Sequence, residues 1–413
     1  MRFHRASADL TPLADISFAT AARARHDREV NGDLVVQASI GTLCDDQQKI
    51  IAFPSVYEHF DAMAARTKAR YAESFTGNAS FREAVAAWVL EDHVRTLHRA
   101  VIATPGGTGA LWAAMNTFLD PGETVILPEI AWNSYAAMAR HNGLQVCTYQ
   151  MFADDHFNFA SLRQAMTDVS CRQDRVVFLL NTPCNNPTGY SLSDGEWDIL
   201  IDLVNEISET CPVVMVIDVA YFDYVNEPAA RSSFCRHLDR INDGVMVNIL
   251  FSISKTMTAY GMRCGASILL ARRHEDVRNI EIILEKTARL TWSNVNNAAM
   301  ECFAWAVTAD RDTLKEEIQT GVSLLKERSE IFLKEAAEYG LELYPYREGF
   351  FCTLKYEDPE FAASMFEALM NSHIYTVRVN GGIRIALCSL PKAQAAGLAR
   401  RIRTVQDQLT AGR

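Results

Sequence analysis

The feature that most constrains the fold is a series of short, continuously apolar segments separated by stretches with helical periodicity. Strands buried on both faces read as continuous rather than alternating apolar runs. Strands that alternate with helices favour a mostly parallel sheet covered by helices on each side. The sequence therefore predicts an α/β domain whose strands include residues 101–103, 124–127, 176–180, 213–217 and 245–251.

The pattern changes toward the C-terminus. A long helical stretch is expected over residues 295–340, followed by alternating strand and helix segments at 349–354, 361–372 and 382–387. A chain of 413 residues exceeds one ordinary core. We therefore predict a large α/β domain over residues 51–295 and a smaller α+β domain built from residues 1–50 and 296–413.

Charge and composition exclude several classes of function. The net charge of -11 and the pI near 5.5 argue against a nucleic-acid or anionic-membrane partner, because phosphate surfaces select basic faces. No apolar run is long enough for a membrane span, and the first residues lack the apolar core of a signal peptide, so we expect a cytoplasmic protein. The ten cysteines form no C-x-x-C pair, so neither a metal site nor a disulfide framework is expected.

One lysine lies among serine and arginine residues that could bind a ligand together with it. The stretch 252–265 reads SISKTMTAYGMRCG, which places Lys255 after two serines at the end of an apolar strand, with Arg263 eight residues later. A lysine amine condenses with aldehydes, and serine hydroxyls with an arginine suit a phosphate. A lysine beside a phosphate-bearing aldehyde is the arrangement of pyridoxal phosphate (PLP) enzymes. Taken alone, such a lysine is more often a solvated surface residue.

A glycine-rich turn, TPGGTG over residues 104–109, lies between a strand and a helix. Glycines let the backbone approach an anion, and the first turn of a helix offers free NH groups. The dinucleotide pattern G-x-G-x-x-G is excluded, because Trp112 occupies its last glycine position. The turn is therefore either an anion cup or a plain tight turn.

Two further motifs follow predicted strands. The loop NTPCNNPTGY, residues 181–190, contains an Asn186–Pro187 step that fixes the backbone and is either cis or trans. Asp218 ends the strand 213–217, with Tyr221 three residues on. Ligands bind at the carboxyl ends of strands in open α/β sheets, so Asp218 is a ligand-site candidate; a helix cap or ion pair is the alternative.

Taken together and in this order, these motifs resemble the fold type I PLP-dependent aminotransferases of class I/II, a group that includes aspartate and aromatic amino acid aminotransferases. The resemblance covers essentially the whole chain. It implies PLP as the cofactor, a large domain with a mostly parallel sheet of the seven-stranded type between helices, and a smaller α+β domain.

The resemblance also assigns roles. Lys255 would bind PLP covalently and then carry the proton from the substrate Cα, while Asp218 would pair with the pyridine nitrogen. Asn186 and Tyr221 would donate to the ring phenolate, and Trp132 would stack on the ring unless it is a core residue. The phosphate would be held by Gly107, Thr108, Ser252, Ser254 and Arg263. The serine that the family has at the position of Gly106 is missing.

For the substrate, Arg384 matches the arginine that takes the α-carboxylate, and Gly41 matches a backbone contact to the same group. Tyr71 resembles a tyrosine that reaches the neighbouring subunit's phosphate, which implies a homodimer with shared active sites. Arg289 aligns with the arginine that binds the side-chain carboxylate of dicarboxylic substrates, or else pairs with Glu285 or another acid.

Three other positions bear on the substrate. Phe350, Phe351 and Tyr135, with Trp132, line an aromatic pocket or belong to the core. Asn181 replaces a histidine of the aspartate-specific branch, which argues for a more distant subgroup.

The implied activity is transamination between an L-amino acid, aromatic or dicarboxylic, and a 2-oxo acid such as 2-oxoglutarate, by a ping-pong mechanism. A β-elimination C–S lyase or a decarboxylase on the same cofactor is the alternative. A PLP-binding regulator is less favoured, because only about 50 residues precede the match and the charge is acidic.

Overall fold

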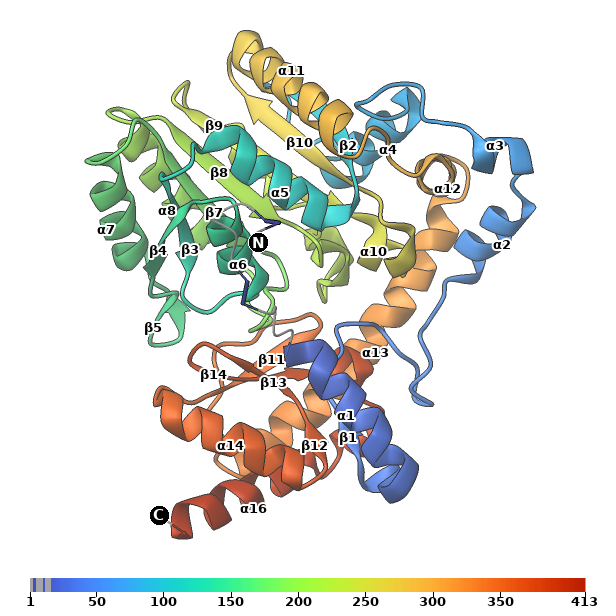
Figure 1. The fold of residues 1–413 in the computed structure, drawn as a ribbon, viewed down its shortest axis with the longest axis vertical. Helices are drawn as coiled ribbons and strands as arrows, with labels where there is room; N and C mark the ends of the chain where they lie inside the picture. Colours follow the sequence, from blue (N-terminus) through green and yellow to red (C-terminus); the bar gives the residue numbers. More distant parts are fainter. Residues whose placement is uncertain (1–2, 5–9, 12–15, 413) are drawn as a thin grey trace.

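The computed structural model describes residues 3–4, 10–11 and 16–412, and its centre is a seven-stranded sheet (Figure 1). The strand order is β2-β10-β9-β8-β7-β3-β4, and β10 is antiparallel to both of its neighbours while the other pairs are parallel. The predicted α/β class with a mostly parallel sheet is confirmed. The strands are β2 (His98–Thr104), β3 (Thr124–Pro128), β4 (Gln145–Tyr149), β7 (Val176–Asn181), β8 (Val213–Asp218), β9 (Val245–Ser252) and β10 (Gly265–Ala271).

Side chains of each central strand alternate between two apolar layers, which explains the continuous apolar runs in the sequence. In β7, Val176 and Phe178 join the core on one face of the sheet, whereas Val177 and Leu179 join the core on the other. The first face is covered by α4 (Ala79–Val89), α7 (Phe159–Ser170), α8 (Asp194–Ser208), α9 (Cys235–Leu238) and α12 (Asn297–Thr308). The second is covered by α5 (Gly106–Phe118), α6 (Ser134–His141) and α11 (His274–Thr291).

The register of the sheet brings the predicted motifs to one edge. Asn181 pairs with Asp218 across β7 and β8, so both parallel strands end at the same level. In the antiparallel strand β10, Gly265 pairs with Ser252 on one side and with Thr104 on the other. The glycine turn, the Asn181 loop, the aspartate and the lysine stretch therefore all begin at this edge.

A smaller unit lies below the large sheet in Figure 1. Its three-stranded antiparallel sheet has the order β11-β14-β13, and the N-terminal strand β1 (Val36–Gln37) pairs in parallel with β12 (Ile374–Tyr375). The N-terminal segment therefore packs with C-terminal elements. The remaining elements of this unit are α1 (Ile16–Asn31), β11 (Phe351–Lys355), α14 (Pro359–Asn371), β13 (Val377–Val379), β14 (Gly382–Ala386), α15 (Lys392–Ala395) and α16 (Leu398–Ala411).

The helical stretch expected over 295–340 is two helices. The helix α12 ends at Thr308, and α13 (Arg311–Glu338) runs from α12 toward the smaller unit (Figure 1). The apolar side chains of α12 join the core under the large sheet, and those of α13 near its C-terminal end join the core of the smaller unit. Of the predicted small domain, residues 1–2, 5–9, 12–15 and 413 lie outside the described residues.

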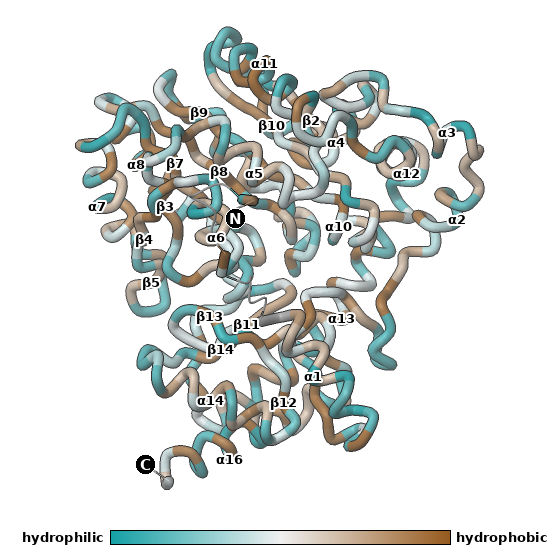
Figure 2. Tube along the Cα trace, viewed as in Figure 1, coloured by the Kyte–Doolittle hydropathy of each residue, from teal (hydrophilic) through white to brown (hydrophobic). Residues whose placement is uncertain are grey.

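The other elements connect these layers. The short helices α2 (Pro54–Ala62) and α3 (Ala65–Ala69) lead into α4, the hairpin β5 (Phe152–Ala153) and β6 (His156–Phe157) follows β4, and α10 (Ile253–Thr256) follows β9. Figure 2 shows the apolar residues concentrated along the central strands. Among the described residues, no helix combines the length and apolar character needed to cross a membrane.

Candidate active site

A cavity of about 400 Å³ lies at the strand edge where the sequence motifs meet, between the large sheet and the smaller unit. Its lining comes from strand ends, from the first turn of α5 and from β14, and also from α1. It contains twelve of the fourteen residues predicted as a site, namely Gly41, Gly107, Thr108, Trp132, Asn186, Asp218, Tyr221, Ser252, Ser254, Lys255, Arg263 and Arg384.

Lys255 sits in the short helix α10, directly after the last residue of β9. Its Nζ lies 5.2 Å from the ring centre of Tyr221 and 5.7 Å from that of Tyr260. Burial lowers the pKa of the ammonium, Asp218 opposes that shift, and Arg263 adds to it. A lowered pKa enlarges the fraction of neutral amine, which is the nucleophilic form.

Hydrogen bonds from neighbouring side chains fix the backbone around Lys255. The hydroxyl of Tyr224 donates to the Lys255 carbonyl at 2.9 Å, and Thr256 Oγ1 donates to a carboxylate oxygen of Asp223 at 2.5 Å. Asp223 is buried and also receives Arg231 Nη1 at 2.8 Å. These contacts fix the turn after β9, so the position of the amine does not depend on its own side-chain contacts alone.

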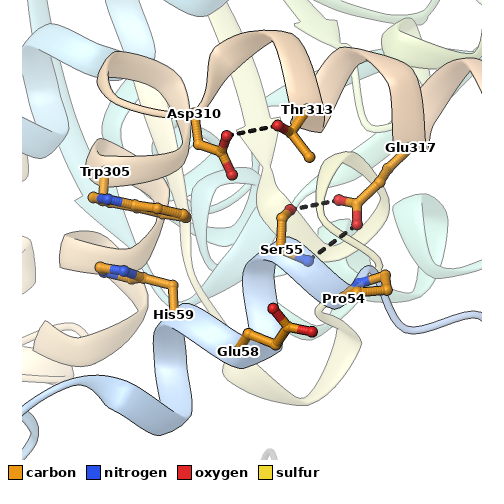
Figure 3. Close-up of a pocket in the computed structure, with 8 residues that line it drawn as sticks. All are labelled: Pro54, Ser55, Glu58, His59, Trp305, Asp310, Thr313 and Glu317. Carbon is orange, nitrogen blue, oxygen red and sulfur yellow. Dashed lines mark hydrogen bonds between the residues drawn. The ribbon is translucent and has the colours of Figure 1, made fainter.

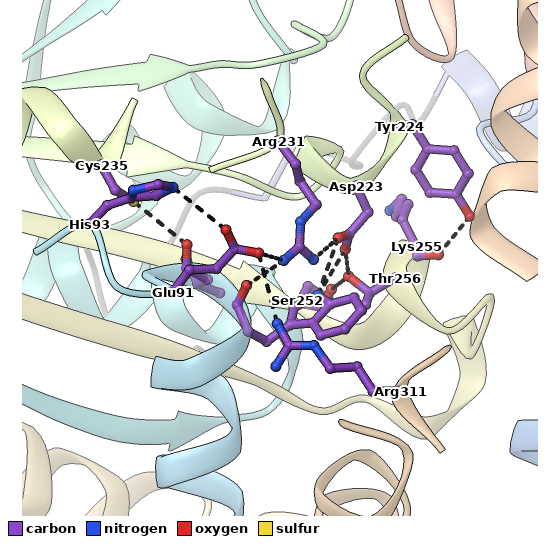
Figure 4. A network of polar contacts seen from close by, with 12 residues as sticks. Glu91, His93, Asp223, Tyr224, Arg231, Cys235, Ser252, Lys255, Thr256 and Arg311 are labelled. Atoms are coloured by element: carbon purple, nitrogen blue, oxygen red, sulfur yellow. Dashed lines mark hydrogen bonds and ion pairs between the residues drawn. The ribbon is translucent and has the colours of Figure 1, made fainter. Parts of the chain in front are cut away.

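The network behind the lysine continues from Asp223 to Arg231 and Glu91, as Figure 4 shows. Arg231 pairs with Glu91 at 2.6 Å, and its guanidinium lies 4.2 Å from the ring centre of Trp88. Trp88 donates its indole NH to Asp223 at 3.2 Å. Every charge in this buried cluster has a partner, as burial of ions requires.

Asp218 has a partner that the sequence did not reveal. The buried hydroxyl of Tyr135, in α6, donates to Asp218 Oδ2 at 2.6 Å, and the backbone NH of Ala220 donates to Oδ1 at 3.0 Å. Burial raises the pKa of Asp218, and the Tyr135 hydrogen bond opposes that rise by stabilising the carboxylate. Each carboxylate oxygen therefore accepts one hydrogen bond, and together these bonds fix the orientation of the carboxylate.

The predicted asparagine loop is tied to this aspartate. Asn181 Nδ2 donates to the Asp218 carbonyl at 2.8 Å, and the backbone NH of Asn186 donates to Asn181 Oδ1 at 2.6 Å. Asn186 Nδ2 lies 3.4 Å from the Tyr221 hydroxyl. The cis peptide of the described chain falls at Thr182–Pro183 rather than at Asn186–Pro187.

The residues predicted to hold a phosphate form a cup. Gly107 and Thr108 lie in the first turn of α5, where helix NH groups are free to bind anions. The Ser252 hydroxyl donates to that of Ser254 at 3.0 Å, and Arg263 Nη1 donates to Ser254 Oγ at 3.1 Å. The cup therefore combines helix NH groups, the hydroxyls of Thr108, Ser252 and Ser254, and one guanidinium.

The missing serine at Gly106 has a steric explanation. A Cβ at this residue would lie 2.6 Å from Arg263 Nη2, and the backbone has φ +74°, which disfavours residues other than glycine. The arginine therefore occupies the space that a side chain at 106 would need.

Arg384 enters the cavity from the smaller unit. It lies in the central strand β14 and is 6% exposed; its Nη1 donates to Asn186 Oδ1 at 3.0 Å and its Nη2 to the Ser39 carbonyl at 2.9 Å. Its guanidinium lies 4.3 Å from the ring centre of Phe351. A Cβ on Gly41 would approach that same ring to 3.0 Å, so glycine keeps this wall open.

Two predicted residues are not in the lining of the cavity. Tyr71 is 82% exposed on the loop after α3. Arg289, near the end of α11, donates to Ser293 Oγ at 2.9 Å and lies 5.0 Å from the ring centre of Phe75. Arg289 therefore contacts the loop that carries Tyr71, on the outer surface of this chain.

Several lining residues were missed by the sequence analysis. One face of α1 contributes Phe18, Ala21 and Arg25, and the turn between Lys255 and Arg263 contributes Tyr260. The spacing of three and four residues in α1 was a signal that could have been read, because it places side chains on one helical face. The place of α1 beside the cavity, however, could not be predicted from the sequence.

A second, more open pocket of about 420 Å³ lies between α2 and the start of α13, and it shares no lining residue with the first (Figure 3). In this pocket the ring of His59 stacks on that of Trp305, with ring centres 3.8 Å apart. Ser55 Oγ donates to Glu317 at 2.5 Å, which ties α2 to α13. Within the described ranges, no group of three His, Cys, Asp or Glu side chains is arranged to hold a metal ion.

The fold and the cavity define a class of α/β proteins that build a ligand site at strand ends around a lysine, an aspartate and an anion cup. The family described as aminotransferase class I and II matches residues 35–402, and the chain belongs to this family.

Solved structures and curated proteins are also similar to this chain. An aminotransferase from Anaerococcus prevotii is 31% identical, with a TM-score of 0.93 over 98% of this chain and 99% of that one. An aromatic-amino-acid aminotransferase from Burkholderia pseudomallei, covalently bound to pyridoxal phosphate, is 20% identical with a TM-score of 0.81 over 98% of this chain and all of the other, and it shows the fold alone.

Mitochondrial aspartate aminotransferases of Schizosaccharomyces pombe and Gallus gallus are 24% and 26% identical over 62% of this chain. The match spans 59% and 60% of the length of those two relatives.

Proposed function

We propose that this protein is a PLP-dependent aminotransferase that moves an amino group between an L-amino acid, aromatic or dicarboxylic, and a 2-oxo acid such as 2-oxoglutarate, by a ping-pong mechanism. The observation that carries the proposal is the position of Lys255 in one cavity with Asp218, the anion cup and Arg384. Membership of the aminotransferase family and the PLP-bound relative support it.

The donor set fits PLP group by group. The cup of Gly107, Thr108, Ser252, Ser254 and Arg263 suits a phosphate, because it offers NH groups, hydroxyls and a guanidinium. Asp218 suits a protonated ring nitrogen, Asn186 and Tyr221 suit a phenolate, and Trp132 suits a ring face. When bound, PLP supplies a ring that withdraws electrons from the substrate Cα.

The chain's own residues then have distinct tasks. Lys255 would hold the cofactor through Nζ, and its free amine would be the base that takes the proton from the substrate Cα. Arg384 binds the α-carboxylate as a fork, with Gly41 contributing backbone on the same wall. Tyr135 donates to the Asp218 carboxylate, which favours its ionised form and fixes its orientation.

We also propose a division into a large domain, residues 51–295, and a small domain, residues 1–50 and 296–413. We propose a homodimer with shared active sites, located in the cytoplasm. The exposure of Tyr71 and the position of Arg289 beside Phe75 support the dimer, since both side chains are available to a second subunit.

A cofactor half-reaction tests the activity. The purified protein, supplied with PLP, should show visible cofactor absorbance, and addition of single amino acids should convert the cofactor to its pyridoxamine form. Absence of cofactor absorbance would refute PLP binding. Loss of absorbance with release of pyruvate or ammonia, and no pyridoxamine form, would identify a lyase; release of carbon dioxide would identify a decarboxylase.

A further inference from the structure

The charges in the cavity are not all accounted for by the proposed function. Among the described lining residues, the cationic side chains are Arg25, Lys255, Arg263 and Arg384, and Asp218 is the acid. Arg263 belongs to the anion cup, Arg384 is assigned to the α-carboxylate, and Lys255 binds the cofactor. The guanidinium of Arg25 therefore lacks an anionic counterpart.

The position of Arg25 is set by its helix. Phe18, Ala21 and Arg25 follow each other at intervals of three and four residues, so they share the face of α1 that lines the cavity. Ala24, on another face, is buried in the core of the smaller unit and fixes the rotation of the helix. In Figure 1, α1 belongs to the lower unit and α5, which carries the anion cup, to the upper sheet.

The guanidinium of Arg25 is also free to bind a ligand. It is exposed, and it makes no hydrogen bond, ion pair or ring contact with any other residue that the structure describes. By contrast, Arg23 on the same helix donates to Asn371 Oδ1 at 3.2 Å, and Arg28 donates to the Val35 carbonyl at 2.9 Å. An arginine fork that lines a ligand cavity and has no protein partner suits a carboxylate of the ligand.

We propose that Arg25 binds the side-chain carboxylate of a dicarboxylic amino acid or 2-oxo acid, and so determines specificity from within the same chain. This inference rests on the proposed aminotransferase function and names the substrate class of that site. Arg289 is the alternative candidate: in this chain it donates to Ser293 outside the cavity, and it would reach a substrate only from the second subunit of the proposed homodimer. A substrate held at both ends, by Arg384 and by Arg25, has its Cα fixed between them.

The test compares matched variants of the holoenzyme. Arg25→Gln removes the proposed contact, Arg25→Lys keeps the charge without the fork, and Arg23→Gln removes the same charge from the same helix outside the cavity. Arg289→Gln tests the alternative. Each variant is assayed for kcat/KM with aspartate, glutamate, alanine and phenylalanine.

We expect Arg25→Gln to lower kcat/KM for aspartate and glutamate by about 10- to 100-fold, the worth of one charged hydrogen-bonding contact, and to spare alanine and phenylalanine. Arg25→Lys should recover part of the loss, and Arg23→Gln should match the parent. Unchanged use of dicarboxylic substrates by Arg25→Gln, an equal loss with all four amino acids, or a selective loss in Arg289→Gln alone would overturn the assignment.

Equilibrium binding separates this inference from the proposed function. Succinate carries two carboxylates and butyrate one, and neither requires turnover. Binding of succinate should weaken by a similar factor in Arg25→Gln, whereas binding of butyrate should not. If the parent protein catalyses no transamination, the aminotransferase proposal fails, and the succinate measurement still decides whether Arg25 binds a second carboxylate.

Discussion

The hydrogen bond from Tyr135 to Asp218 makes a sharp prediction. Tyr135→Phe removes one hydroxyl from a residue that is 1% exposed and leaves its ring packing intact. The lost contact is a 2.6 Å hydrogen bond to a carboxylate, and such contacts contribute about 1.5–3 kcal/mol. Since 1.4 kcal/mol is tenfold, kcat/KM should fall by about 10- to 100-fold if the ionised carboxylate is needed.

The same hydrogen bond predicts the direction in which the pH profile of kcat/KM shifts. Burial already raises the pKa of Asp218, and the Tyr135 hydroxyl holds it down. Without that donor the pKa rises further, so the carboxylate becomes protonated at a higher pH than in the parent protein. The acidic limb of the profile of kcat/KM against pH should therefore move to higher pH in Tyr135→Phe.

A matched control is available in the apolar layer on the other face of the large sheet. Tyr149 is equally buried, and its hydroxyl has no hydrogen-bond partner among the described residues. Tyr149→Phe should leave both the rate and the pH profile unchanged. A Tyr135→Phe protein with parental kcat/KM and an unmoved acidic limb would refute the role of Tyr135, and equal effects in the two variants would show that the loss is not specific.

Three further variants test other parts of the site. Gly106→Ala should weaken PLP binding by about tenfold or more, measured by equilibrium dialysis, because its Cβ would lie 2.6 Å from Arg263 at φ +74°; parental affinity would contradict this. Thr256→Val should lower the free energy of unfolding in urea by about 1–3 kcal/mol, because Asp223 loses a buried donor; an unchanged midpoint would contradict this. Arg384→Lys should lower kcat/KM about 100-fold for every amino acid while PLP affinity stays constant, because a point charge replaces a fork; a loss confined to one substrate class would contradict it.

The central lysine and aspartate were predictable because their sequence positions determine their place in the fold. Asp218 ends one continuously apolar strand and Lys255 follows another, and parallel strands bring their carboxyl ends to one edge. The same reasoning placed Gly107 and Asn186 there. The large fold followed from the same apolar runs, since alternation across two layers makes every residue of β7 buried.

The roles of other residues in the site could not be predicted, because these roles arise from tertiary contacts. Tyr135 looks like any aromatic residue of an amphipathic helix, and its partner lies 83 positions away. Arg25 lies far from every motif, and only the packing of α1 brings it to the cavity. The absence of a serine at Gly106 was visible, but its cause, the position of Arg263, was not.

The most direct test of the proposal is to locate the cofactor on the chain. Borohydride reduction of the PLP-loaded protein makes the bond between cofactor and lysine permanent, and peptide mass spectrometry then identifies the modified residue. The label should be found on Lys255 and should disappear in Lys255→Ala, which should still bind PLP noncovalently. No label, or a label on another lysine with Lys255 unmodified, would contradict the proposed active site.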